Sequence, residues 1–133
     1  MSYRNYLSCT GSPPTSENGE NQPLKRKPYH KSEGNFEIEI EDIMLGIDRR
    51  TTCMIKNIPN KYSLKMLIDL LNEDHSGTYN FLYLRMDFKN RCNVGYAFVN
   101  FDNCMSIISF YKKIHGKSWK RFTSNKICEL TYA

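Results

Sequence analysis

The sequence predicts an α+β fold, a ferredoxin-like βαββαβ sandwich in which two helices cover one face of a four-stranded antiparallel sheet. From residue 51 onward, periodic segments follow in the order strand, helix, strand, strand, helix, strand. One parity of the strand residues carries no charge, as a face covered by helices requires. The 133 residues suffice for one such domain, expected over 51–133, and a tail.

The first strand is expected in TCMIKNI, which Pro59 ends, and the first helix in SLKMLIDLLNED, which Gly77 ends. Ser63 has the hydroxyl that an N-cap position favours. The leucines and isoleucine of this helix recur at the spacing of one helical face. They are Leu64, Leu67, Ile68 and Leu71.

Two more strands, YNFLYLRMDF and VGYAFVNF, are joined by a polar loop, and a second helix follows in DNCMSIISFYKKIHG. This helix is expected to begin at Asp102 or Asn103 and to stop at Gly116. A basic loop containing Trp119, which either joins the core or contacts a base, leads to the last strand, KICELTYA. Cys104, Ile108 and Tyr111 are expected to share one face of the second helix.

Residues 1–35 are rich in Ser, Asn, Gly, Pro and Glu, which predicts a disordered tail. Within them, PLKRKPYHK is either a nuclear import signal or a solvated basic linker. Residues 36–50 form an N-terminal extension expected to lie on the domain edge. There Phe36, Ile38 and Ile40 alternate with glutamates, which predicts an extended arm before one helical turn ended by Gly46.

Charge and cysteine content limit the classes of function. Residues 51–133 hold twelve Lys/Arg and six Asp/Glu, a net charge of +6, which suits a polyanionic partner. The five cysteines have no CxxC spacing, which disfavours a disulfide scaffold or a zinc ribbon and favours a reducing compartment, nucleus or cytoplasm. No apolar run has the length of a membrane span, and the first residues lack the apolar core of a signal peptide. We expect no metal and no cofactor.

Strand parity predicts which sheet face is open. One set of alternate residues is uncharged and is expected to face the helices, with Gly95 and Ala97 letting a helix approach closely. This set is Cys53, Ile55, Leu82, Leu84, Met86, Ala97, Val99, Phe101, Cys128 and Leu130. The other set includes charges that are rarely buried unpaired, and is expected to face away. It is Met54, Lys56, Phe81, Tyr83, Arg85, Tyr96, Phe98, Asn100, Glu129 and Thr131.

An uncovered sheet face bearing four aromatic rings and two cations is typical of a binding surface. Flat rings with interleaved cations suit splayed nucleotide bases and their phosphates, and stacking contributes roughly 1–3 kcal/mol per base. Two alternatives remain open. The FEIEIEDIM arm could cover this face, or the rings could form ordinary cross-strand pairs.

A sequence motif points in the same direction. VGYAFVNF matches seven of the eight positions of the octamer K/R-G-F/Y-G/A-F-V-x-F/Y that marks RNA recognition motifs. Only the initial basic residue is missing, at Val94. CMIKNI in the first strand resembles the hexamer that accompanies this octamer, with Met54 where a ring usually stands.

RTTCMIKNIPNKYS, GTYNFLYLRMDFKNRCNVGYAFVNF and FYKKIHGKSWKRF resemble the C-terminal RNA recognition motif of the Mei-two-like family of meiosis-regulating RNA-binding proteins. The likeness runs from about Phe36 to Ala133, and Met54 is usual in this family. The resemblance implies binding of single-stranded RNA and, for family members, a role in meiosis or differentiation. It names the partner that the open sheet face would take.

The expected RNA-binding residues fall into three groups. Rings and a thioether would stack on bases: Tyr96, Phe98, Tyr83, Phe81 and Met54. Cations would meet phosphates: Lys56, Arg85, Lys89 and Arg91, the last two replacing the missing octamer cation, with further attraction from Lys117, Lys120, Arg121 and Lys126. Polar side chains would bind base edges: Asn100, Glu129 and Thr131. Asn57 and Asn60 are expected to form the turn around Pro59.

Two other classes of function compete with RNA binding. An enzyme of the same fold would need a glycine-rich phosphate cradle after the first strand, and NIPNKYS has no glycine. His30, His75 and His115 adjoin no expected nucleophile, so we expect no catalysis. The alternative function is an RNA-recognition-motif-like protein-interaction module. The expected partners are single-stranded RNA and possible proteins, with no membrane, and the expected state is a monomer.

Overall fold

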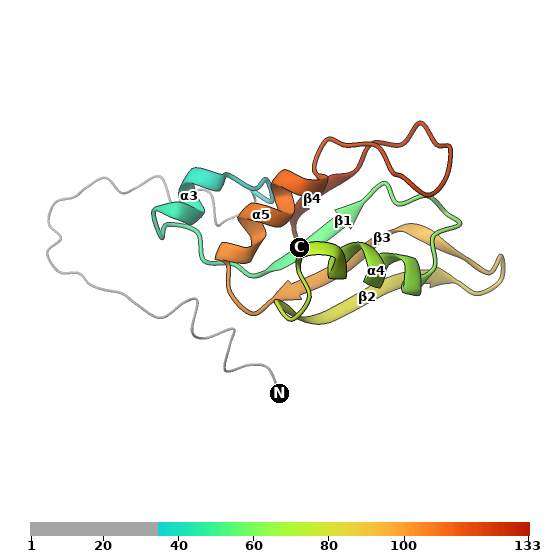
Figure 1. The fold of residues 1–133 in the computed structure, drawn as a ribbon, viewed down its shortest axis with the longest axis horizontal. Coiled ribbons are helices and arrows are strands. Elements are labelled where there is room, and N and C mark those ends of the chain that lie inside the picture. The colour runs from blue at the N-terminus through green and yellow to red at the C-terminus, as the bar shows by residue number, and fades with distance from the viewer. Residues whose placement is uncertain (1–34) are drawn as a thin grey trace, which may run out of the picture.

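The computed structural model describes residues 35–133 and contains one four-stranded antiparallel sheet in the order β2-β3-β1-β4 (Figure 1). The predictions for the tail and for PLKRKPYHK lie outside these residues. The predicted βαββαβ sandwich is confirmed, with one short helix before it. The elements are α3 (Ile40–Met44), β1 (Thr52–Lys56), α4 (Leu64–Asp74), β2 (Tyr79–Asp87), β3 (Cys92–Phe101), α5 (Met105–Ile114) and β4 (Glu129–Tyr132).

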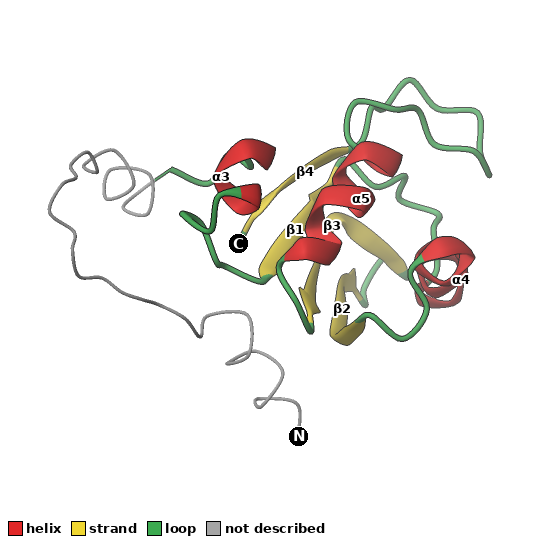
Figure 2. Ribbon diagram, turned by 60° about the vertical axis from the view of Figure 1, so that its left-hand side comes forward, coloured by secondary structure: helices red, strands yellow, loops and turns green. Residues whose placement is uncertain are grey.

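The core lies between the sheet and the helices α4 and α5, which cover the same face (Figure 2). Side chains of the uncharged parity set supply the sheet side, and Ile55, Val99 and Phe101 are fully buried. Leu67 of α4 and Ile107 of α5 are equally buried from the other side. Each such side chain contributes about 1.5–3 kcal/mol through removal from water.

The first helix begins as predicted, because the Ser63 hydroxyl accepts a hydrogen bond from the amide of Met66 at 3.2 Å. The buried stripe of α4 is narrower than the sequence pattern. Leu67 and Leu71 are fully buried, whereas Leu64, in the first turn, is 46% exposed. Ile68 is half-buried.

Of the three residues expected to share a face of the second helix, Cys104 is buried and the other two are not. Ile107, Phe110 and Ile114 are its buried side chains, whereas Ile108 and Tyr111 are half-buried. Both sets have helical spacing, so periodicity alone could not choose between them. Aromatic packing accounts for the buried set, since the centroids of the Phe110 and Phe101 rings lie 5.5 Å apart.

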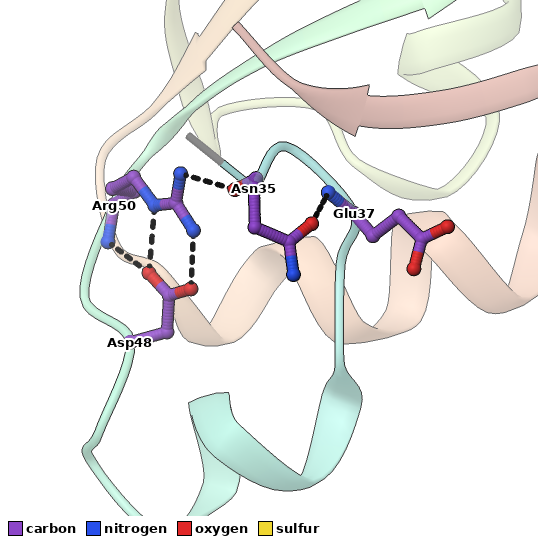
Figure 3. Close-up of polar contacts among 4 residues, drawn as sticks. All are labelled: Asn35, Glu37, Asp48 and Arg50. Carbon is purple, nitrogen blue, oxygen red and sulfur yellow. Dashed lines mark hydrogen bonds and ion pairs between the residues drawn. The ribbon is translucent and has the colours of Figure 1, made fainter. Parts of the chain in front are cut away.

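The extension before β1 lies beside β4 and α5. The carbonyl oxygen of Phe36 accepts from the amide of Tyr132 at 2.7 Å. Ile38 and Ile43 join the core, and α3 lies next to α5 in both views (Figures 1 and 2). At its end, Arg50 holds Asp48 through two parallel hydrogen bonds (Figure 3).

The loop after β1 is tied to two other segments. The Asn57 amide, at a residue with φ of 63°, donates to the carbonyl of Ile127 at 2.9 Å. The Asn60 amide donates to the carbonyl of Asn93 at 2.9 Å. Both asparagines therefore form the turn, as predicted. Trp119 is 8% exposed and belongs to the core cluster, so its core interpretation holds.

Gly95 has a different role from the predicted one. A Cβ atom there would meet no atom within 4 Å, so this glycine does not make room for a helix. Its φ of +106° is the reason for a glycine, because a side chain strains that backbone conformation. Gly95 also accepts a hydrogen bond from the amide of Ile58 at 2.9 Å, beside a shift of register between β2 and β3.

Candidate nucleic-acid interface

Strand register places the open-face residues in rows across the sheet. Phe98 of β3 pairs with Tyr83 of β2 on one side and with Met54 of β1 on the other. Met54 pairs in turn with Thr131 of β4. The sequence identified which residues share this face, and register determines which of them are neighbours. A ring, a second ring and a thioether are therefore adjacent.

A second row carries the charge. Tyr96 of β3 pairs with Lys56 of β1, and Lys56 pairs with Glu129 of β4. Arg85, on β2, is exposed on the same parity as Tyr83. Neither Lys56 nor Arg85 makes an ion pair within residues 35–133, so both cations are available to an anion.

The rings of the open face remain in contact with solvent. Phe81 is 53% exposed and Tyr83 is 47% exposed, and Tyr96 and Phe98 are half-buried. The rings of Tyr96 and Phe98 meet edge to face at 5.7 Å with an interplanar angle of 80°. The arm does not seal this surface, because Phe81 and Tyr83 stay exposed while Ile38 of the arm is buried in the core.

The β2–β3 loop presents two further cations. The Asp87 carboxylate accepts from the backbone amides of Lys89 and Asn90 at 3.0 and 3.3 Å, which closes the turn. Hydrogen bonding, first from the Asn90 side chain, lowers the pKa of Asp87. Lys89 and Arg91 are exposed and make no ion pair in the described part of the chain. The loop therefore projects positive charge beside the rings.

Asn100, predicted to bind base edges, has its hydrogen-bonding groups engaged within the protein. Its Oδ1 accepts from the hydroxyls of Thr51 and Thr52 at 2.7 and 2.6 Å. Its Nδ2 donates to Asn80 Oδ1 at 2.9 Å and to the carbonyl of Phe101 at 3.3 Å. Two acceptor sites and two donors are all that an amide side chain has. Asn100 locks the strands rather than presenting free donors.

Thr131, also predicted to bind base edges, is buried and has its hydroxyl engaged within the protein. It is 5% exposed, and its hydroxyl donates to the carbonyl of Tyr132 at 2.9 Å. Beside it, the arm and β4 line a polar hollow that includes Glu37, Glu39 and Glu129. Parity placed Thr131 on the open face, but burial at the sheet edge leaves its hydroxyl no access to a base.

Four basic residues around the last strand have different surroundings. Lys126 Nζ donates to the carbonyl of Ile58 at 3.1 Å, and Lys117 Nζ donates to the carbonyl of Lys112 at 2.9 Å. Lys126 therefore joins two loops, and Lys117 binds a carbonyl in the last turn of α5. Lys120 and Arg121 are exposed on the helix side, away from the ring-bearing face.

Phe88 is a candidate contact that sequence reasoning missed. It lies in the β2–β3 loop beside Lys89 and is 83% exposed. The sequence did contain a signal, because packing in the core does not explain a large apolar residue in a polar turn. Exposed rings next to cations suit the same ligands as the sheet face.

The two histidines among residues 35–133, His75 and His115, show no catalytic arrangement. His75 Nε2 lies 2.6 Å from the Ser109 hydroxyl, a neighbour that the sequence did not indicate. However, His75 is 4% exposed, and its Nδ1 has no partner among the described residues, so no acid orients the pair. His115 Nδ1 accepts from the amide of Leu130 at 3.1 Å.

Metal clusters and membrane-spanning helices are not found within residues 35–133. No group of three or more His, Cys, Asp or Glu side chains there could hold a metal ion. No helix of this region has the length and apolar character needed to cross a bilayer. Burial raises the pKa of Cys53 well above its usual range and raises that of Cys128 to about 12, so neither is a reactive thiolate.

Comparisons with known proteins agree with this surface. The chain matches the family model described as RNA recognition motif 2 over residues 50–133. It is 51% identical over 123 residues to Protein MEI2-like 5 of Arabidopsis thaliana, and this match covers 92% of this chain and 14% of that protein. It is 55% identical over 98 residues to Protein MEI2-like 3 of Oryza sativa subsp. japonica, covering 74% and 10%. The chain thus spans a small part of these relatives.

Solved structures share the fold. The structure of the Rna15 RRM with bound RNA (GU) matches with a TM-score of 0.52 at 20% identity, covering 62% of this chain and 81% of that one. The Sxl-lethal protein/RNA complex matches with a TM-score of 0.52 at 25% identity, covering 63% and 47%. The ring-bearing sheet of this chain therefore belongs to a fold found in complexes with RNA.

Proposed function

Because the chain belongs to the RNA recognition motif 2 family, we propose that its open sheet face binds single-stranded RNA. One observation supports the proposal most directly: solvent-accessible rings on β2 and β3 adjoin cations that form no ion pair with a carboxylate of the described residues. An RNA strand offers the complementary groups, flat bases and negative phosphates. The exposed rings would otherwise leave an apolar surface in water.

Tyr96 and Phe98 are the proposed stacking residues. Their edge-to-face contact at 5.7 Å holds the two rings at fixed angles, which limits the ordering cost when a base arrives. Tyr83 extends the surface, since it pairs directly with Phe98. Met54 adds a polarizable contact on the other side of Phe98.

Four cations are proposed to meet the phosphates: Lys56, Arg85, Lys89 and Arg91. They lie on two sides of the ring cluster, on the sheet and in the β2–β3 loop. This placement suits an RNA strand that crosses the sheet. Phe88, at the loop, offers a further ring. Because such contacts release counterions, affinity should fall steeply with added salt.

The geometry favours unpaired nucleotides over a duplex. Bases in a duplex are stacked on one another and cannot present a face to a protein ring. The rings here lie on a broad sheet, which an A-form helix would meet only with its backbone. Single-stranded DNA is the competitor to test, because it offers the same stacking faces and phosphates but lacks the 2′-hydroxyl.

The biological role can be proposed only in general terms, from the relatives. Relatives that cover most of this chain are named MEI2-like proteins. That similarity supports a role in regulating RNA during meiosis or differentiation, in the nucleus or cytoplasm. The chain matches only a small part of each relative, so this proposal rests on the domain alone.

Fluorescence anisotropy with short labelled RNAs tests the proposed surface. The full chain and the double variant Tyr96→Ala/Phe98→Ala are titrated against a random single-stranded pool at low salt. We expect the double variant to lose about 2 kcal/mol or more of binding free energy, because stacking contributes roughly 1–3 kcal/mol per base. Phe36→Ala is the matched control, since this ring is exposed but lies on the arm.

Two results would contradict the proposal. Equal affinities of the double variant and the unchanged chain would show that the rings take no part. Preference for duplex RNA in a parallel titration would remove the argument from stacking. A protein-interaction module would give the first result and would keep its partner in high salt.

A further inference from the structure

A groove on the helix side of the sheet has no part in the proposed RNA surface. It encloses a cavity of about 350 Å³ between α4, α5 and the loop at residues 117–121. Met66 and Leu70 of α4, Ile114 of α5, and Tyr62 and Trp119 supply its apolar walls. We call it the helix groove. This volume lies in the range of small-ligand and side-chain pockets.

The helix groove offers no surface on which a base could stack. The Tyr62 ring meets Trp119 at 5.1 Å and Phe122 at 5.7 Å, both edge to face. Trp119 is 8% exposed, so its faces are occupied by its own neighbours. A concave apolar site without an open ring favours an aliphatic or aromatic side chain that inserts into it, rather than a nucleotide.

The rim of the groove is positively charged. Four cations line it, Lys113, Lys117, Lys120 and Arg121, against two carboxylates, Asp69 and Glu73. Lys113 is shared between Glu73 at 2.9 Å and Asp74 at 3.0 Å. Lys120 and Arg121 are exposed and make no ion pair within the described region. The free charge at the groove is therefore cationic, which selects an acidic occupant.

We propose that the helix groove binds a short acidic peptide segment of a partner protein, anchored by one large apolar side chain. The anchor fills the cavity beside Met66 and Leu70, and flanking carboxylates meet Lys120 and Arg121. Figure 2 shows α4 and α5 on one face of the sheet. The rings alternate with the buried side chains of β2 and β3 and so face the other way, which lets the peptide and RNA bind at the same time.

Defined peptides test this site on the full chain. The probe is an eight-residue synthetic peptide with Leu-Trp at its centre and Asp or Glu elsewhere. One comparison peptide has Ala-Ala at the centre, and another has Lys or Arg in place of the acids. We expect only the acidic Leu-Trp peptide to bind with a Kd below about 1 mM. In NMR spectra it should shift the amide signals of 66–73 and 113–121 and leave those of β3 unmoved.

Two charge-reversal variants separate the groove from the RNA surface. Lys120→Glu/Arg121→Glu should weaken peptide binding about tenfold or more and leave RNA affinity within about twofold. Arg85→Glu/Lys89→Glu removes the same charge and should do the reverse. Because peptide binding and NMR shifts need no RNA, this inference can fail or succeed independently of the proposed function.

Three outcomes would overturn the inference. The first is no binding of the acidic Leu-Trp peptide at about 1 mM. The second is equal binding of the basic or Ala-Ala peptide, which would show that neither charge nor an anchor matters. The third is loss of RNA affinity rather than peptide affinity in Lys120→Glu/Arg121→Glu, which would make this loop part of the nucleic-acid site.

Discussion

The guanidinium carbon of Arg50 lies 3.9 Å from the centroid of the Tyr132 ring, which is 1% exposed. The same guanidinium donates to both oxygens of Asp48, at 3.0 and 2.7 Å, and to the carbonyl of Asn35 at 3.1 Å (Figure 3). These hydrogen bonds to Asp48 are the main reason that the pKa of Arg50 is raised. One side chain thus joins the extension before β1 to the last strand.

Arg50→Ala should destabilise the domain by about 2–4 kcal/mol, because it leaves the buried Asp48 carboxylate unpaired and removes the cation from the Tyr132 ring. Urea denaturation followed by circular dichroism measures the loss. Arg50→Lys should recover only part of it, since an ammonium cannot make two parallel hydrogen bonds. Arg85→Ala, on an exposed arginine, is the control. A midpoint for Arg50→Ala equal to that of the control would contradict this role.

Asn93→Ala should cost about 2–4 kcal/mol, because the Asn93 side chain serves several buried backbone groups at once. Its amide donates to the carbonyls of Pro59 and Tyr62, each at 2.9 Å, and its oxygen accepts from the amide of Gly95 at 2.7 Å. Urea denaturation gives the cost, and hydrogen exchange should show faster opening of residues 57–62. Asn90→Ala, in the exposed β2–β3 loop, should cost far less. Equal losses would mean that the buried contacts carry no special weight.

The fold could be predicted from the sequence because its signals are local. Alternation in the strands and glycines such as Gly46, Gly77 and Gly116 marked the elements, and parity identified the open face. Helix rotation was not predictable in the same way. Whether Phe110 or Tyr111 of α5 is the buried ring depends on contact with Phe101 of β3. The spacing of apolar residues along the helix does not reveal a contact with a different element.

The site was predicted less completely, for a related reason. Exposed rings follow from parity, but the availability of a polar group depends on distant partners. Asn100 is occupied by Thr51 and Thr52, about fifty residues earlier, and Thr131 by burial at the sheet edge. Three segments far apart in sequence meet in the helix groove, so only the folded chain shows it.

Stability should fall as pH drops below about 6.5, the usual pKa of histidine, because the pKa of His75 is lowered in the folded chain. Burial is the main cause, the charge of Lys113 adds to it, and that of Asp74 opposes it. Between the lowered value and about 6.5 the unfolded chain binds the extra proton, so the contribution is complete above this window and is lost below it. Urea denaturation from pH 7.5 to 5 measures the slope.

His75→Gln should flatten this dependence, because glutamine does not titrate and can still bond to the Ser109 hydroxyl. The carboxylates with lowered pKa values, Asp74 and Asp87, lose their contribution only below about 4 and so do not interfere. An unchanged slope in His75→Gln would assign the effect to another group. If this variant is too unstable, NMR titration of His75 in the unchanged chain measures its pKa directly, and a value of 6.5 or above would contradict the argument.

Met54→Phe should tighten single-stranded RNA binding by about 1 kcal/mol, roughly fivefold, because a ring stacks on a base better than a thioether does. Met54 is half-buried beside Phe98 and Thr131, so a phenyl ring there would lie in the same row as Tyr83. Anisotropy titration against the same RNA pool measures the gain. Met44→Phe, a change of the same kind at a residue that is 62% exposed on α3, should leave the affinity unchanged. Weaker binding by a fully folded Met54→Phe would show that the RNA needs the narrower side chain at this point of the sheet.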